Sequence, residues 1–205
     1  MDSQLVAIAQ AAKGFMPDDE GIALYEAGVQ AARLGPLLEV GSYCGKSAVY
    51  LGAAAKEGGS VLYSVDHHRG SEENQPGQEY HDPDLLDEEG RVDSLPWFRS
   101  TIEEAGLTTW VVGIVGDSAT VAKGWATPLG LVFIDGGHSK GAAETDYESW
   151  APKLMASGLL AIHDVFPDPA DGGRPPFDIW QRALASGTFE ELDARGSLRV
   201  LRKNG

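Results

Sequence analysis

The sequence predicts a three-layer α/β sandwich, in which helices cover both faces of a mostly parallel sheet. Short apolar strands alternate with helical stretches from residue 36 onward, and each strand is a nearly continuous apolar run. Repeated strand–helix units imply parallel strands joined by right-handed crossovers, and continuous apolar runs are expected where both sheet faces are covered. The last two strands, over 188–194 and 197–203, have no helix between them and predict an antiparallel hairpin at one edge.

Individual elements follow from the same patterns. Two helices are expected first, over 2–13 and 18–34, and the second begins after Pro17 with an acidic turn that complements its dipole. Five strands are expected at 36–40, 61–65, 110–115, 131–134 and 158–162. Helices are expected at 45–57, 95–106, 118–124, 142–155 and 176–186. Such sheets bind ligands outside the carboxyl ends of their strands, so residues that directly follow a strand are the candidates for function.

Composition narrows the class of partner. The chain has 205 residues, 42% hydrophobic and 23% charged, as expected for one globular domain over 1–205. Its formal net charge of −15 would repel nucleic acid and anionic membranes, so we expect a small-molecule partner and neither of these two. The single cysteine, Cys44, excludes an intrachain disulfide, and no stretch is typical of a signal peptide or a membrane span. We therefore expect a cytoplasmic protein.

The turn after the first strand, "EVGSYCGKS" at 39–47, has the composition of a ligand cradle. Gly41 permits a tight turn and close approach of a ligand. Gly45 opens the next helix, whose N-terminal amides can receive a carboxylate or a phosphate. Asp66 ends the second strand, where an acidic residue commonly holds a ribose diol. A demanding turn with a solvated aspartate is the alternative, but Glu39 together with Asp66 favours nucleoside binding.

The stretch "EVGSYCGKSAVYL" resembles the first motif of class I S-adenosylmethionine (SAM) methyltransferases, particularly catechol O-methyltransferase and related metal-dependent O-methyltransferases. The resemblance implies a Rossmann-like sandwich from about residue 36 onward, with SAM as the methyl donor. It also implies which residues bind SAM: Glu39, Gly41, Tyr43, Gly45 and Ser47, with Asp66 on the ribose hydroxyls and Asp117 and Ser118 beside the adenine.

The stretch "LVFIDGGHSKG" ends the fourth strand with a carboxylate, two glycines and an imidazole. In the metal-dependent family the corresponding aspartate binds a divalent cation, and the residue three positions later removes the substrate proton. The resemblance thus implies Asp135 as a metal ligand and His138 as the catalytic base. The fifth strand ends in "AIHDVF", which places His163 and Asp164 at the two further ligand positions.

His163 departs from the family, which usually has oxygen ligands at both of these positions. We expect magnesium bound by Asp135 and Asp164; a histidine ligand would instead suit zinc, manganese, iron or cobalt. Metal-independent methylation with His138 alone as the base is an alternative, and a strand-terminal aspartate or histidine can also have a purely structural role.

The segment 67–94 is too long for an ordinary connection and leaves the carboxyl edge of the sheet, so it is expected to form a lid or substrate loop. Its carboxylates, amides and histidines suit a polyhydroxylated acceptor, and His67 and His68 are its first candidates for substrate binding. The chain is similar to bacterial sugar O-methyltransferases of the macrocin type and those acting on methylated mannose oligosaccharides.

Three alternatives to a sugar O-methyltransferase stay open. The acceptor can be a catechol or another phenol, and the protein can be a nicotinamide-dependent oxidoreductase or a SAM-binding module without catalysis. The glycine spacing, G-x-x-x-G, misses the dinucleotide pattern and counts against the oxidoreductase. The N-terminal helices within 1–35 either line the pocket or form the contact of a homodimer.

Overall fold

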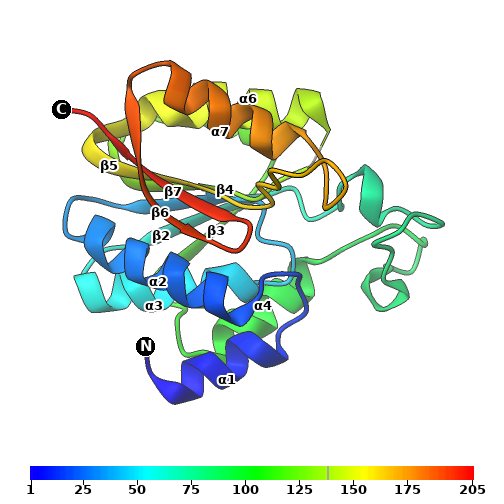
Figure 1. Ribbon diagram of the computed structural model, residues 1–205. Helices are drawn as coiled ribbons and strands as arrows, with labels where there is room; N and C mark the ends of the chain where they lie inside the picture. The colour runs from blue at the N-terminus through cyan, green and yellow to red at the C-terminus, as the bar shows by residue number, and fades with distance from the viewer. Residues whose placement is uncertain (138) are drawn as a thin grey trace.

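The computed structural model describes residues 1–137 and 139–205 and contains one seven-stranded sheet (Figure 1). The strands are β1 (Leu37–Val40), β2 (Leu62–Asp66), β3 (Val111–Val115), β4 (Leu129–Ile134), β5 (Leu154–Ile162), β6 (Phe189–Arg195) and β7 (Leu198–Lys203). Their order is β3-β2-β1-β4-β5-β7-β6, with β1 to β5 parallel and β7 antiparallel to both of its neighbours. The predicted Rossmann-like sandwich with a closing hairpin is confirmed.

Helices cover both faces of the sheet (Figure 1). One face carries α1 (Ser3–Ala11), α2 (Asp18–Ala32), α3 (Lys46–Gly58) and α4 (Leu95–Glu104). The other carries α5 (Ser118–Lys123), α6 (Lys140–Trp150) and α7 (Pro175–Ala185). Short 3-10 turns lie at Glu72–Asn74, Pro83–Leu85 and Ala151–Lys153. Every residue of β1 and β4 is buried, as expected for central strands between two helical layers.

The boundary between α6 and β5 differs from the prediction. The helix was expected to run to residue 155, but it ends at Trp150, and β5 begins at Leu154. Pro152 explains the early end, because a proline inside a helix removes a hydrogen bond and clashes with the preceding turn. Ser157, with φ of 64°, gives β5 a local irregularity before it pairs with the centre of β4.

The segment 67–94 projects from the carboxyl edge of the sheet (Figure 1, teal to green). Leu85 and Val92 bury their side chains with Cys44, which attaches the segment to the loop after β1. Lys13, in the connection between α1 and α2, forms ion pairs of 2.6 Å and 2.8 Å with Asp82 and Asp84. The segment is therefore packed against both the N-terminal connection and the loop after β1.

Gly41 directly follows β1 and passes close to the backbone that follows β4. A Cβ at this position would lie 2.2 Å from the carbonyl oxygen of Asp135, and the residue has φ of 85°. We expect Gly41→Ala to lower the free energy of unfolding by about 2–3 kcal/mol, because backbone strain and overpacking act together. Urea denaturation followed by circular dichroism measures this change.

The matched control for this substitution is Gly59→Ala. Gly59 also has positive φ, 68°, but nothing lies within 4 Å of an added Cβ. The Gly59→Ala substitution should lower the free energy of unfolding by about 1 kcal/mol, because only backbone strain opposes it. Equal losses for the two variants would contradict the argument from close approach.

Candidate active site

A cleft of about 1080 Å³ opens at the carboxyl ends of β1, β2, β4 and β5. The sequence-predicted residues that line it are Gly41, Tyr43, Ser47, Asp66, His67, Asp117, Ser118, Asp135, His163 and Asp164. Glu39, Gly45 and His68 are not among the described residues that line the cleft. His138, the predicted base, lies outside the described residues. The strand ends thus gather most of the predicted site in one place.

Asp66 organises the loop after β1. One of its carboxylate oxygens accepts hydrogen bonds from the amides of Ser42 and Tyr43, each 2.9 Å long, and the other accepts from the amide of His68 at 2.7 Å. These bonds hold Tyr43 and His68 at φ of 45° and 57°, where residues other than glycine are uncommon. Asp66 therefore fixes the shape of the loop; its contact with a ribose stays a prediction.

His68 turns away from the cleft. Its ring is buried, with Nδ1 2.8 Å from the Ser94 hydroxyl and its centroid 5.3 Å from that of Phe98. Burial lowers the pKa of His68 below its usual value. In this arrangement His68 attaches the start of segment 67–94 to α4, whereas His67 lines the cleft.

A polar group lies in the cleft after β3, where adenine binding was predicted. Asp117 caps α5 by accepting from the Thr120 amide and hydroxyl, and the Ser118 hydroxyl accepts from the Trp150 indole at 2.8 Å. Asp146, on α6, also lines the cleft, and burial raises its pKa to about 6. The sequence analysis missed Asp146, although this carboxylate lies on the same helix face as Ala143 and Trp150.

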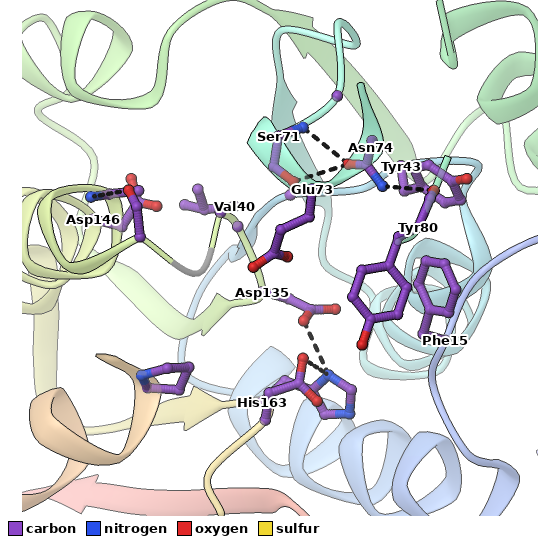
Figure 2. Close-up of a pocket in the computed structure, with 18 of the residues that line it drawn as sticks. Phe15, Val40, Tyr43, Ser71, Glu73, Asn74, Tyr80, Asp135, Asp146 and His163 are labelled. Carbon is purple, nitrogen blue, oxygen red and sulfur yellow. Dashed lines mark hydrogen bonds and ion pairs between the residues drawn. The ribbon is translucent and has the colours of Figure 1, made fainter. Parts of the chain in front are cut away.

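Asp135, His163 and Asp164 form one cluster at the ends of β4 and β5 (Figure 2). A ligand atom from each of them lies within 4.8 Å of the others. The Nδ1 atom of His163 is 3.0 Å from Asp135 Oδ1 and 3.5 Å from Asp164 Oδ2. Asp164 has φ of 55°, so this junction carries backbone strain. Two carboxylates and one imidazole nitrogen are a donor set that a divalent cation can use, so the residues present fit the predicted metal.

Glu20 of α2 approaches the other side of the same imidazole, which the sequence analysis did not foresee. Its Oε2 lies 2.9 Å from His163 Nε2, and both side chains are buried. Burial works against a charged imidazole, but Asp135, Asp164 and Glu20 together raise the pKa of His163 well above its usual value. An acidic residue in the first turn of a helix is ordinarily explained by the helix dipole, so no sequence pattern pointed to this contact.

An aromatic group borders the cleft beside this cluster (Figure 2). The Phe15 ring centroid lies 5.8 Å from that of Tyr43 and 5.2 Å from that of Tyr80. Phe15 is 62% exposed and Tyr80 41% exposed, although both are large and apolar. Figure 2 shows Tyr80 and Glu73 of segment 67–94 directed toward Asp135. The N-terminal connection therefore lines the pocket, which was one of the two roles considered for the region 1–35.

Comparison with known proteins agrees with this arrangement. Residues 38–165 match a family model described as a methyltransferase domain, and the match spans more than half of the chain. The chain therefore belongs to this family, and the predicted methyltransferase class is confirmed.

Solved structures share the fold at low sequence identity. The chain is similar to the O-methyltransferase TomG from Streptomyces achromogenes in complex with SAM, at 14% identity and a TM-score of 0.66, over 100% of this chain and 91% of TomG. It is also similar to the O-methyltransferase from Bacillus cereus in complex with SAH, at 17% identity and a TM-score of 0.64, over 99% of this chain and 92% of that one. A third similar structure is cofactor-bound Rv0187 from MTB, at 16% identity and a TM-score of 0.67, over 97% of this chain and 87% of Rv0187.

The described residues contain no helix that is both long and apolar enough to cross a membrane.

Proposed function

We propose that this protein is a SAM-dependent O-methyltransferase that methylates a hydroxyl of a small polyhydroxylated acceptor, such as a sugar or a mannose-containing oligosaccharide. The observation that carries the proposal is the meeting of two features in one cleft. The loop held by Asp66 follows β1, and the cluster Asp135, His163 and Asp164 follows β4 and β5. The family match favours methyl transfer over the nicotinamide-dependent oxidoreductase considered from the sequence.

In this proposal the two regions have separate tasks. The loop after β1, the N-terminus of α3 and the polar group at Asp117 hold the methyl donor, while the cluster and His138 serve the acceptor. A divalent cation bound by Asp135, His163 and Asp164 would lower the pKa of the acceptor hydroxyl and fix its direction. Alignment of donor and acceptor can contribute about 7–11 kcal/mol, and a base such as His138 adds about 10²–10⁴ in rate.

A phenolic acceptor is the second candidate, and the aromatic group at Phe15, Tyr43 and Tyr80 is the observation that favours it. Flat rings pack against aromatic side chains in offset or edge-to-face arrangements. The carboxylates and amides of segment 67–94, including Glu73 and Asn74 in the cleft, favour an acceptor with several hydroxyls.

The direct test is transfer of a radiolabelled methyl group from SAM to a panel of sugars and catechols, with and without EDTA. Transfer to a sugar that EDTA abolishes and Mg²⁺ restores is the expected result. Transfer to catechols alone would contradict the sugar acceptor and support the phenolic one. Full transfer in the presence of EDTA would contradict a role for a metal ion. Binding of SAM without methyl transfer to any acceptor would contradict the proposed catalysis. Full turnover by the His138→Ala variant would contradict His138 as the base.

Tyr80 should contribute to acceptor binding. We expect Tyr80→Ala to raise the KM for the acceptor by about tenfold and to leave the KM for SAM unchanged, because an aromatic contact contributes about 0.5–1.5 kcal/mol. Tyr80→Phe is the matched control: it keeps the ring and should keep the KM within about twofold. Steady-state kinetics with each substrate varied in turn measures both, and an equal change in the two KM values would contradict an acceptor-specific role.

A further inference from the structure

Glu20 is a buried carboxylate outside the predicted site, and it contacts the candidate metal cluster through one residue. It comes from α2, whereas the cluster belongs to the ends of β4 and β5. Its Oε2 faces Nε2 of His163 at 2.9 Å, and Nδ1 of the same ring faces Asp135 at 3.0 Å. The imidazole therefore lies between the Glu20 carboxylate on one side and the carboxylates of the cluster on the other.

Glu20 is itself held by the β6–β7 turn. Its Oε1 accepts from the amide of Ser197 at 2.8 Å, and its Oε2 accepts from the Ser197 hydroxyl at 2.9 Å. Gly196 in the same turn has no room for a side chain, because a Cβ there would lie 2.1 Å from Glu20 Oε1. With both of its oxygens held in this way, the Glu20 carboxylate faces His163 Nε2 in a fixed position from which it can accept Nε2–H.

A histidine that binds a metal usually donates its second N–H to a carboxylate or a carbonyl, which fixes the tautomer and the ring orientation. Here the Glu20 carboxylate is in the position to accept from Nε2–H, and Nδ1 of the same ring faces Asp135 and Asp164. Without an ion Nδ1–H donates to Asp135; a cation bound by the two carboxylates would take the place of that proton, and Nδ1 would then be the nitrogen that faces it. Imidazole nitrogen suits manganese, iron, cobalt and zinc, whereas magnesium prefers oxygen ligands.

We propose that Glu20 is a positioning residue that presents His163 Nδ1 as a nitrogen ligand, so that the cluster prefers a transition-metal ion such as Mn²⁺ over Mg²⁺. This inference rests on the metal site of the proposed function and refines the expectation of magnesium drawn from the sequence. Ser197 belongs to the same arrangement, because it lies in the β6–β7 turn and holds the Glu20 carboxylate through two hydrogen bonds.

The test uses the full chain and the metal ions alone. The affinities of Mn²⁺ and Mg²⁺ are measured by isothermal titration calorimetry, and bound Mn²⁺ is examined by pulsed EPR for coupling to ¹⁴N. We expect Mn²⁺ to bind at least tenfold more tightly than Mg²⁺ and to show ¹⁴N coupling that His163→Asn removes. Equal affinities for the two ions, or Mn²⁺ bound without ¹⁴N coupling, would overturn the proposal on the wild-type protein alone.

Variants of α2 isolate the contribution of Glu20. Glu20→Gln should weaken Mn²⁺ binding by about 10–100-fold, the range typical of an outer-shell partner, and should change Mg²⁺ binding much less. Glu26→Gln, an exposed position on the same helix, is the control and should change neither. Equal Mn²⁺ affinity in the two variants would refute the role of Glu20.

The affinity for SAM, measured on the same samples, reports whether each variant is folded. It also separates the two proposals. If the wild-type chain neither binds SAM nor transfers a methyl group, the proposed function is wrong. Retained transfer with no metal binding contradicts only the metal site and the role of Glu20.

Discussion

Asp135→Asn is expected to lower the rate of methyl transfer by 100-fold or more and to remove most of the affinity for a divalent cation. The Asp135 carboxylate is part of the cluster with His163 and Asp164, and a cation that polarises the acceptor contributes several kcal/mol to the rate. Asparagine keeps the size of the side chain, and the close contact with Gly41 involves the Asp135 backbone, so the fold should be retained. Single-turnover transfer at saturating SAM measures the rate.

The matched control is Asp171→Asn, which removes an exposed carboxylate that lines the same cleft but lies outside the cluster. It should keep both the rate and the metal affinity within about twofold. A wild-type rate for Asp135→Asn, with unchanged sensitivity to EDTA, would contradict the assignment of this carboxylate to the metal. Loss of SAM binding in Asp135→Asn would show instead that the substitution damages the whole cleft.

The part of the site at the strand ends was predictable because parallel strands bring their carboxyl ends to one edge. Asp66, Asp135 and Asp164 each lie directly at or after a strand, so knowing that β2, β4 and β5 share a sheet places all three around one cleft. The fold followed from the same information, since the apolar runs of β1, β2 and β4 are mostly buried and each strand–helix alternation is a crossover; the edge strand β3 is apolar but largely exposed. Only helix ends, such as the one before Pro152, depended on local detail that periodicity does not carry.

The rest of the site depends on contacts between segments that the sequence pattern does not pair. Glu20 meets His163 across 143 positions of the chain, and Ser197 meets Glu20 across 177. Phe15 and Tyr80 meet because Lys13 and the pair Asp82 and Asp84 join two loops. Side chains in loops have no periodicity that reports their neighbours, so these residues required the tertiary structure.

Glu39 was predicted from the sequence to bind the methyl donor, but in the structure its carboxylate is buried and does not line the cleft. It is fully buried in β1, and one of its oxygens accepts from the Ser64 hydroxyl at 2.6 Å, while Oε2 has no hydrogen-bond partner among the described residues. Burial raises the pKa of Glu39 to about 8; the hydroxyls of Ser64 and Ser47 oppose the shift, and the nearby charges of Asp135 and Asp66 add to it. The carboxyl is therefore protonated in the folded protein at neutral pH.

This raised pKa makes stability depend on pH in a defined direction. Between pH 4.5 and about 8 the unfolded chain has lost the Glu39 proton and the folded chain retains it, so raising the pH favours unfolding. Each pH unit in this window costs about 1.4 kcal/mol. The contribution of Glu39 is thus fully present below pH 4.5 and falls by about 4–5 kcal/mol in total as the pH rises through 8.

Glu39→Gln replaces the protonated carboxyl by a neutral group of the same shape and removes this titration. We expect the free energy of unfolding of the variant, relative to that of the wild type, to rise by about 4 kcal/mol between pH 5 and pH 8. Urea denaturation at each pH measures the difference, and the exposed Glu104→Gln is the control, which should follow the wild-type profile. Parallel profiles for Glu39→Gln and the wild type would mean that Glu39 is ionised in the folded protein. In that case the cleft would carry a negative charge in its floor before the cationic methyl donor arrives.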